Sequence, residues 1–146
     1  MSHATIARWL LSALCGAQGM GTLAIDLNRT HASNPLWLRH ARFHLVWQAI
    51  SYAMLSAVEV AMILTPGSYQ EQRFYLAAIL ASIPMLSCVV AFVARDLYGG
   101  GLHDPNGIPP LRVVIFGSER LIDLNLAAEA AALLILASIV VLYRLR

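Results

Sequence analysis

The sequence contains no lysine and has few charged residues of either sign. All 10 of its basic residues are arginine, and charged residues make up only 12% of the chain, whereas 59% is hydrophobic. A soluble domain carries about a quarter charged residues, so the shortage of charge indicates an integral membrane protein. The arginines form no run and no basic stripe, and we therefore expect no nucleic-acid partner.

Cysteine is scarce as well. Cys15 and Cys88 are the only two, they form no CxxC pair, and both lie within apolar segments. This pattern argues against a thiol-redox membrane enzyme and favours small packing residues. A cleavage site of the A-x-A type is also missing after the first apolar segment. We therefore expect that segment to be retained as a membrane span rather than removed as a signal peptide.

Four apolar segments approach the ~20 residues that a helix needs to cross a bilayer. They cover residues of about 9–27, 42–64, 74–94 and 121–143. The sequence therefore predicts an all-α fold with a single transmembrane domain over residues 1–146. We expect an antiparallel four-helix bundle in a multi-pass protein of the cell or inner membrane. Four spans place both termini on one side, and the long loops 28–39 and 97–118 together on the other.

Two features predict how these helices pack. The first span carries small or polar residues at steps of three and four, which places them on one face; they are Ser12, Cys15, Gly16, Gly19, Thr22 and Asp26. Small residues let helices approach closely in lipid, so this face suits packing within the bundle or in a homo-oligomer. Pro84, at the middle of the third span, predicts a kink.

The second span has a polar third. At 100° per residue, six polar side chains fall within an arc of roughly 120°; they are His40, His44, Gln48, Ser51, Tyr52 and Glu59. Such a face turns toward a partner helix or a cavity, not toward lipid. Glu59 lies fifteen residues beyond His44, roughly 22 Å along a helix, so we expect it near the opposite interface and apart from the others.

The loops and the last span supply further polar groups at the same end. Loop 28–39 holds His31, and loop 97–118 holds His103 and Asp104 beside turn residues that predict an ordered lid. Its apolar run, residues 113–116, is expected to dip into the membrane or to lie across the mouth of the bundle. Asn125 and Glu129 lie one turn apart on the last span, and carboxylates within a membrane usually mark function.

Three interpretations of this polar set remain open. In the first, His40 and His44 at i,i+4 bind one divalent metal ion, completed by groups from the loops and the first span; these are His31, His103, Asp26 and Asp104. In another, which we call the third, the polar groups are structural and their side chains reach to lipid head groups. The protein would then be a non-enzymatic membrane subunit or a transporter. The second interpretation is given next.

The second interpretation is a metal-free site that needs no cofactor and acts on a small lipophilic molecule. In it, acid–base chemistry of the isomerase or cyclase kind uses the catalytic candidates His40, His44, Asp26 and Glu129. His44 and Glu129 would exchange protons with the ligand, and Asp26 would tune the histidine. The expected ligand contacts are Trp47, Gln48, Tyr52, Asn125, His31 and His103. Whether the protein is an enzyme or a binder is left open by these residues.

The segment DLNRTHASNPLWLRHARFHLVWQ, residues 26–48, resembles the signature segment of a family of small four-span membrane proteins of unknown function. In span count and length the chain also resembles the DoxX-like proteins and the emopamil-binding (EXPERA) proteins. The resemblance to the emopamil-binding proteins implies a membrane cavity lined by carboxylates, histidine and tryptophan. Glu129, Asp26, His44 and Trp47 are the residues available for those roles.

Overall fold

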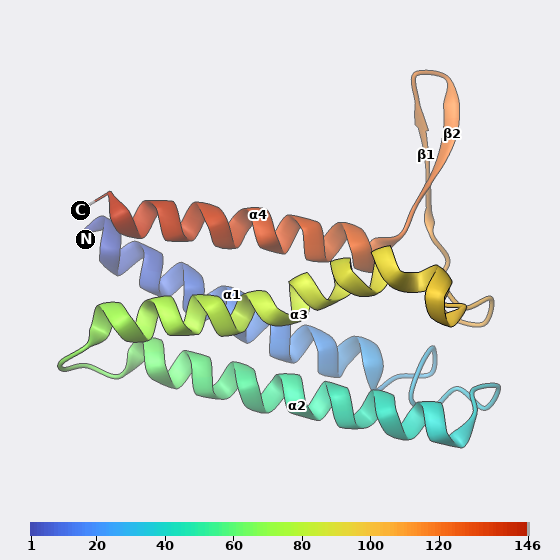
Figure 1. The fold of residues 1–146 in the computed structure, drawn as a ribbon, viewed down its shortest axis with the longest axis horizontal. Coiled ribbons are helices and arrows are strands. Elements are labelled where there is room, and N and C mark those ends of the chain that lie inside the picture. Colours follow the sequence, from blue (N-terminus) through green and yellow to red (C-terminus); the bar gives the residue numbers. More distant parts are fainter. Residues whose placement is uncertain (146) are drawn as a thin grey trace.

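Four helices make up most of the computed structural model, which describes residues 1–145 (Figure 1). They are α1 (His3–Asp26), α2 (Arg39–Leu64), α3 (Gln70–Tyr98) and α4 (Leu124–Arg144). Three of them, α2, α3 and α4, are long and apolar enough to cross a membrane. The predicted mostly helical fold is confirmed, and three of the helices have the length and composition of membrane spans.

The helices run alternately up and down along one long axis (Figure 1). Both termini lie at one end, where His3 Nδ1 and the carbonyl oxygen of Leu145 are 2.6 Å apart. The connections 27–38 and 99–123 lie at the other end. The expected placement of the two polar connections on one side of the bundle is therefore observed.

The packed core occupies the half of the bundle nearest the termini. The rings of Phe74 and Tyr143 stack there with centroids 3.8 Å apart, and Leu11, Ile63 and Met85 are almost fully buried around them. Packing is sparser toward the loop end, where most side chains are half-buried or exposed. The two halves therefore differ: one is a solid core, and the other leaves room between the helices.

The small-residue face of α1 packs against α2 within the same chain. Gly19 lies so close to α2 that an added Cβ would be 2.7 Å from Ser56 Cβ, and the Ser56 hydroxyl donates to the carbonyl oxygen of Cys15. Glu59 is 1% exposed in this interface and lies against the Cys15 thiol. Glu59 was expected apart from the loop-end cluster, and the structure places it within the α1–α2 contact.

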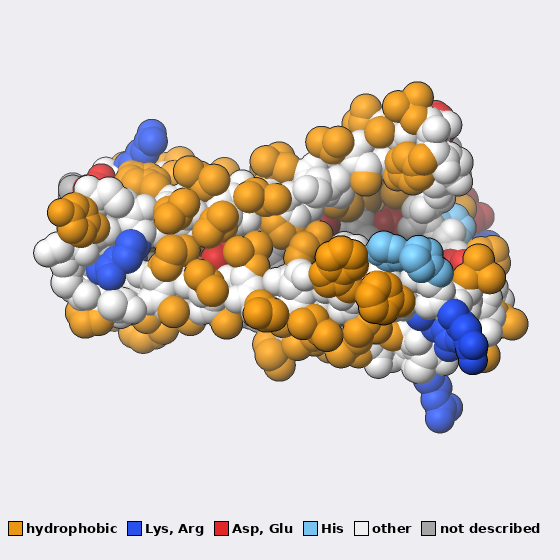
Figure 2. All heavy atoms as spheres, turned by 60° about the horizontal axis from the view of Figure 1, so that its bottom comes forward, with side chains coloured by type: hydrophobic (Ala, Val, Ile, Leu, Met, Phe, Trp, Pro, Cys, Tyr) orange, Lys and Arg blue, Asp and Glu red, His pale blue; other side chains and the backbone are white. Residues whose placement is uncertain are grey.

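The outer surface of the bundle is apolar. Large hydrophobic side chains are exposed along every helix, and Figure 2 shows them covering the length of the molecule with few charges between them. Monomeric soluble proteins rarely expose contiguous apolar surface of this extent. Such a surface is expected of helices that face lipid.

The expected all-α fold is wrong in one segment. The chain forms an antiparallel hairpin of β1 (Leu111–Ile115) and β2 (Ser118–Ile122) where a loop and the start of the last span were predicted. The hairpin projects sideways from the bundle (Figure 1), so the apolar run does not lie across the mouth. Valine and isoleucine favour extended structure, and the turn at residues 116–117 closes the pair, which explains the difference.

Candidate functional site

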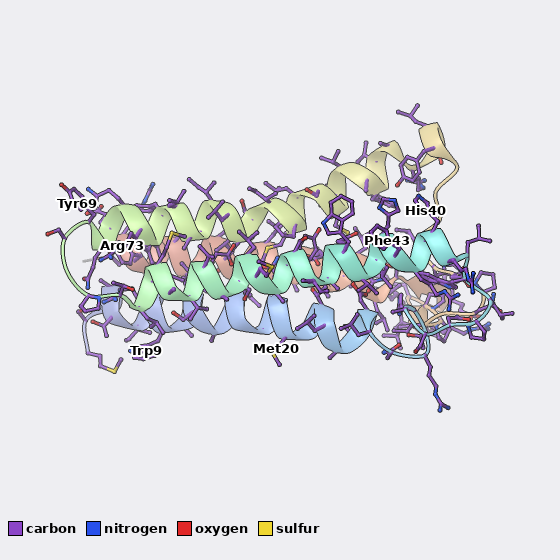
Figure 3. The ribbon with its side chains drawn as sticks, turned by 90° about the horizontal axis from the view of Figure 1, so that it is seen from below. Trp9, Met20, His40, Phe43, Tyr69 and Arg73 are labelled. Carbon is purple, nitrogen blue, oxygen red and sulfur yellow. The ribbon has the colours of Figure 1, made fainter. Side chains whose placement is uncertain are left out.

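A bend in α3 shapes the site. Proline removes a helix hydrogen bond and clashes with the preceding turn, and α3 contains Pro84. Beyond it, α3 diverges from α2 (Figure 3). The side chain of Gln18, from α1, donates to the carbonyl oxygen of Ala81 at 3.4 Å, which supports the backbone next to the bend. The predicted kink is observed, and it opens space between the helices.

This space is a cavity of about 580 Å³ lined by all four helices, called here the interhelical cavity. Ligand sites in proteins commonly have volumes of about 300–1,000 Å³. Its walls are mainly apolar or small, but several polar groups face it; these are Gln18, Thr22, Asp26, Gln48, Tyr52, Ser87, Cys88, Asn125 and Glu129. An apolar cavity with a few convergent polar groups is typical of a small-molecule site.

Two carboxyl groups from different helices share this cavity. Asp26 is the last residue of α1, and Glu129 lies in the second turn of α4. Both are half-buried. Neither side chain makes a hydrogen bond or an ion pair with any other described residue. Opposite them on α2, the Gln48 amide donates to the Tyr52 hydroxyl at 3.2 Å.

A second cavity of about 490 Å³, called here the loop cavity, adjoins the first. The two share three lining residues, Asp26, Gln48 and Asn125. The loop cavity adds His31, Trp37, His103, Asp104 and Asp123. No arginine lines either cavity within residues 1–145, so the acidic groups face them without an opposing guanidinium.

The two connections are joined above the loop cavity through Asn34. Its amide donates to the carbonyl oxygen of Asn106 at 3.1 Å, and its Oδ1 accepts from the backbone N–H of Leu36 at 3.0 Å. On the other connection, Asp104 Oδ1 accepts from the backbone N–H of Asn106 at 2.7 Å. Asn34 is 4% exposed. This residue holds the segment that carries His31 beside the segment that carries His103.

The histidines of α2 are placed differently from the carboxyl groups. His40 and His44 are exposed and line neither cavity. Their Nε2 atoms are 3.0 Å apart, and the exposed Trp47 stacks on His44 with ring centroids 5.8 Å apart. Figure 3 shows His40 and Phe43 pointing from α2 toward the bent half of α3, and Figure 2 shows histidine side chains on the rim of a hollow with acidic groups in its depth.

The structure thus brings together part of the predicted set. Eight of the candidate catalytic, binding and metal-ligating residues line one or both cavities; they are Asp26, His31, Gln48, Tyr52, His103, Asp104, Asn125 and Glu129. His40, His44 and Trp47 lie outside the lining. In the described part of the chain, no group of three or more His, Cys, Asp or Glu side chains is placed to hold a metal ion.

Other lining residues were not identified from the sequence. Gln18 and Cys88 face the interhelical cavity, and neither stands out in a single sequence because isolated glutamine and cysteine are common in packed helices. The position of Cys88, one turn beyond Pro84, is the one signal that could have indicated it. Comparison with known protein families, with curated proteins and with solved structures finds no match for this chain.

Proposed function

We propose that the protein crosses the membrane four times and binds a small lipophilic molecule in the interhelical cavity. α1 is not among the three helices that are long and apolar enough to cross a membrane. Its 24 residues nevertheless extend about 36 Å at 1.5 Å per residue, and it lies alongside the other helices within the bundle (Figure 1). The observation that carries the proposal is the cavity itself: apolar walls from four helices, with two unpaired carboxyl groups facing inward.

The ligand would enter from the bilayer. Figure 2 shows a hollow at the loop end beside the histidine side chains. The exposed apolar side chains of Phe43 and Trp47 lie next to His44 there. A molecule dissolved in the acyl chains can therefore reach the cavity without passing through water. The polar groups at the junction with the loop cavity would bind the polar end of the ligand.

The chemistry that fits this site is proton transfer. A protonated carboxyl group can add a proton to one carbon of the ligand while a carboxylate removes a proton from another, which shifts a double bond with no net gain or loss of electrons. Asp26 and Glu129 line the same cavity and would take these two roles. General acid–base catalysis by positioned groups contributes about 10²–10⁴-fold in rate.

Filling the cavity tests the proposal. Ala128 lines the interhelical cavity, and Ala131, three residues further along α4, is exposed and lines no cavity described above. We expect native mass spectrometry of protein released from mild detergent to show a bound lipophile on the wild type and on Ala131→Trp. Ala128→Trp should lack it, because the indole occupies the ligand volume. Equal occupancy in both variants, or none in the wild type, would contradict the proposal.

A further inference from the structure

The hairpin that replaces the expected lid has an unusual turn. Ile115 pairs with Ser118, so the turn consists of Phe116 and Gly117 alone, and both have positive φ, 49° and 75°. A two-residue turn with positive φ at both positions is type I′, in which Asn-Gly is strongly preferred. A bulky residue in this region of backbone space is strained, and such strain is found where function requires it.

The residue at this strained position is completely exposed. Phe116 is 103% exposed, and its neighbours Val114 and Ile115 are 74% and 45% exposed. Neither strand packs extensively against a helix in the described chain. An isolated two-stranded hairpin is marginal in water, and an exposed phenylalanine adds nothing to its stability there. The hairpin therefore requires an apolar partner.

The direction of the hairpin identifies that partner. The long axis of the bundle is the membrane normal if the apolar helices cross the bilayer. The hairpin projects sideways from the loop end, across this axis (Figure 1), so it extends along the membrane surface at the level of the helix ends. Head groups and the upper part of the acyl chains occupy that level, and apolar or aromatic side chains bind there with their polar neighbours in the head-group region.

The charges of the hairpin agree with this placement. Arg112 and Glu119 form an ion pair at 3.3 Å and neutralise each other. Arg120, opposite Val113 in the ladder, has no ion pair among the described residues. Arginine binds phosphate oxygens through its planar fork of donors, and basic residues near an anionic membrane surface are attracted to it.

We propose that the hairpin is a membrane-interface anchor. The tip, residues 114–116, lies in the boundary between head groups and acyl chains, and Arg120 binds a lipid phosphate. The anchor holds the end of the connection that leads into α4, and so fixes the start of the helix that carries Glu129. This role is separate from ligand binding and stands if the cavity proves empty.

A nitroxide label on Val114→Cys tests the anchor in the full-length protein. The protein is reconstituted in vesicles of phosphatidylcholine with phosphatidylglycerol, in a Cys88→Ala background; the remaining Cys15 is fully buried. Relaxation by oxygen, which concentrates in lipid, is compared with relaxation by a water-soluble nickel chelate. We expect oxygen to dominate at position 114 and the nickel chelate to dominate at Ser68→Cys, in the exposed loop at the opposite end.

Two further variants decide the outcome. Phe116→Asn restores the preferred turn sequence and keeps the hairpin, but it should shift the label at 114 several-fold toward the nickel chelate; Phe116→Leu should retain the lipid signature. The proposal is overturned if position 114 is as accessible to the chelate as position 68. It is also overturned if the label shows spin–spin broadening that disappears on dilution with unlabelled protein, since the partner is then a second copy of the chain.

Discussion

Gly19→Ala is expected to separate α1 from α2 and to lower the free energy of unfolding by about 1–3 kcal/mol, as overpacking of a close contact does. The new Cβ would be 2.7 Å from Ser56 Cβ and 3.3 Å from Ala53 Cα. These atoms belong to the helix backbone or are attached directly to it, so they cannot move without displacing α2. The gain in helix propensity from glycine to alanine, about 1 kcal/mol, opposes this cost. Unfolding of the purified protein in mild detergent, followed by circular dichroism, measures the difference.

Gly16 provides the matched control, because nothing lies within 4 Å of a Cβ added there. Gly16→Ala should leave stability unchanged or raise it slightly. Ser56→Gly combined with Gly19→Ala should recover part of the loss, since it removes the atoms that clash. If Gly19→Ala and Gly16→Ala behaved alike, the close α1–α2 contact would not exist, and the geometry of the cavity beside it would need revision.

Glu129→Gln is expected to slow proton exchange on the bound molecule by about 10²–10⁴-fold, the range for loss of a general acid or base. In heavy water, acid–base chemistry on carbon introduces deuterium into the ligand, so the rate can be followed by mass spectrometry of the lipophile that co-purifies. Asp26→Asn should slow the same exchange, because its carboxyl group lines the same cavity. Binding of the molecule should change much less than exchange in both variants.

Glu119→Gln, on the hairpin, is the control for Glu129→Gln. Glu119 is exposed and lines no cavity described above, so exchange should continue at the wild-type rate. Wild-type exchange in Glu129→Gln would remove that residue from the chemistry and leave it a structural role. Equal slowing in Glu119→Gln would show that the effect comes from disturbed folding or insertion.

The features predicted well from the sequence are those set by local composition and helix period. The low charge and the four apolar segments predict a helical membrane protein, and Pro84 predicts the bend. Because successive helices run in opposite directions, the first and third connections, which are the polar loops, lie at the same end. The small-residue face of α1 indicated a close helix contact, and its partner is α2. These conclusions need only length, hydropathy and the spacing of residues along one helix.

The position of a polar side chain around the bundle could not be predicted in the same way. His44 and Gln48 are one turn apart on the polar third of α2, yet Gln48 lines both cavities and His44 lines neither. Whether a polar side chain of α2 lines a cavity depends on how far α3 bends away beyond Pro84. A helical wheel of α2 contains no information about the position of α3. The hairpin escaped prediction because its apolar run is too short to distinguish a strand from a segment that lies on the membrane.

The resemblance of residues 26–48 to a four-span family, and the looser likeness to emopamil-binding proteins, stay predictions. The structure offers a physical role for part of that segment: Asp26, His31 and Gln48 face the loop cavity, and Asn34 joins the two connections. A member of that family would be expected to share this arrangement: a carboxyl group at the end of the first helix, beneath a loop that carries a histidine.

The most direct test is a crystal structure of the protein grown from a lipid mesophase, with density examined between Asp26 and Glu129. We predict elongated density for a lipophilic molecule inside the interhelical cavity, with its polar end toward Gln48 and Asn125. A straight α3 that closes this space, with the two carboxyl groups directed to water or to lipid head groups, would contradict the account.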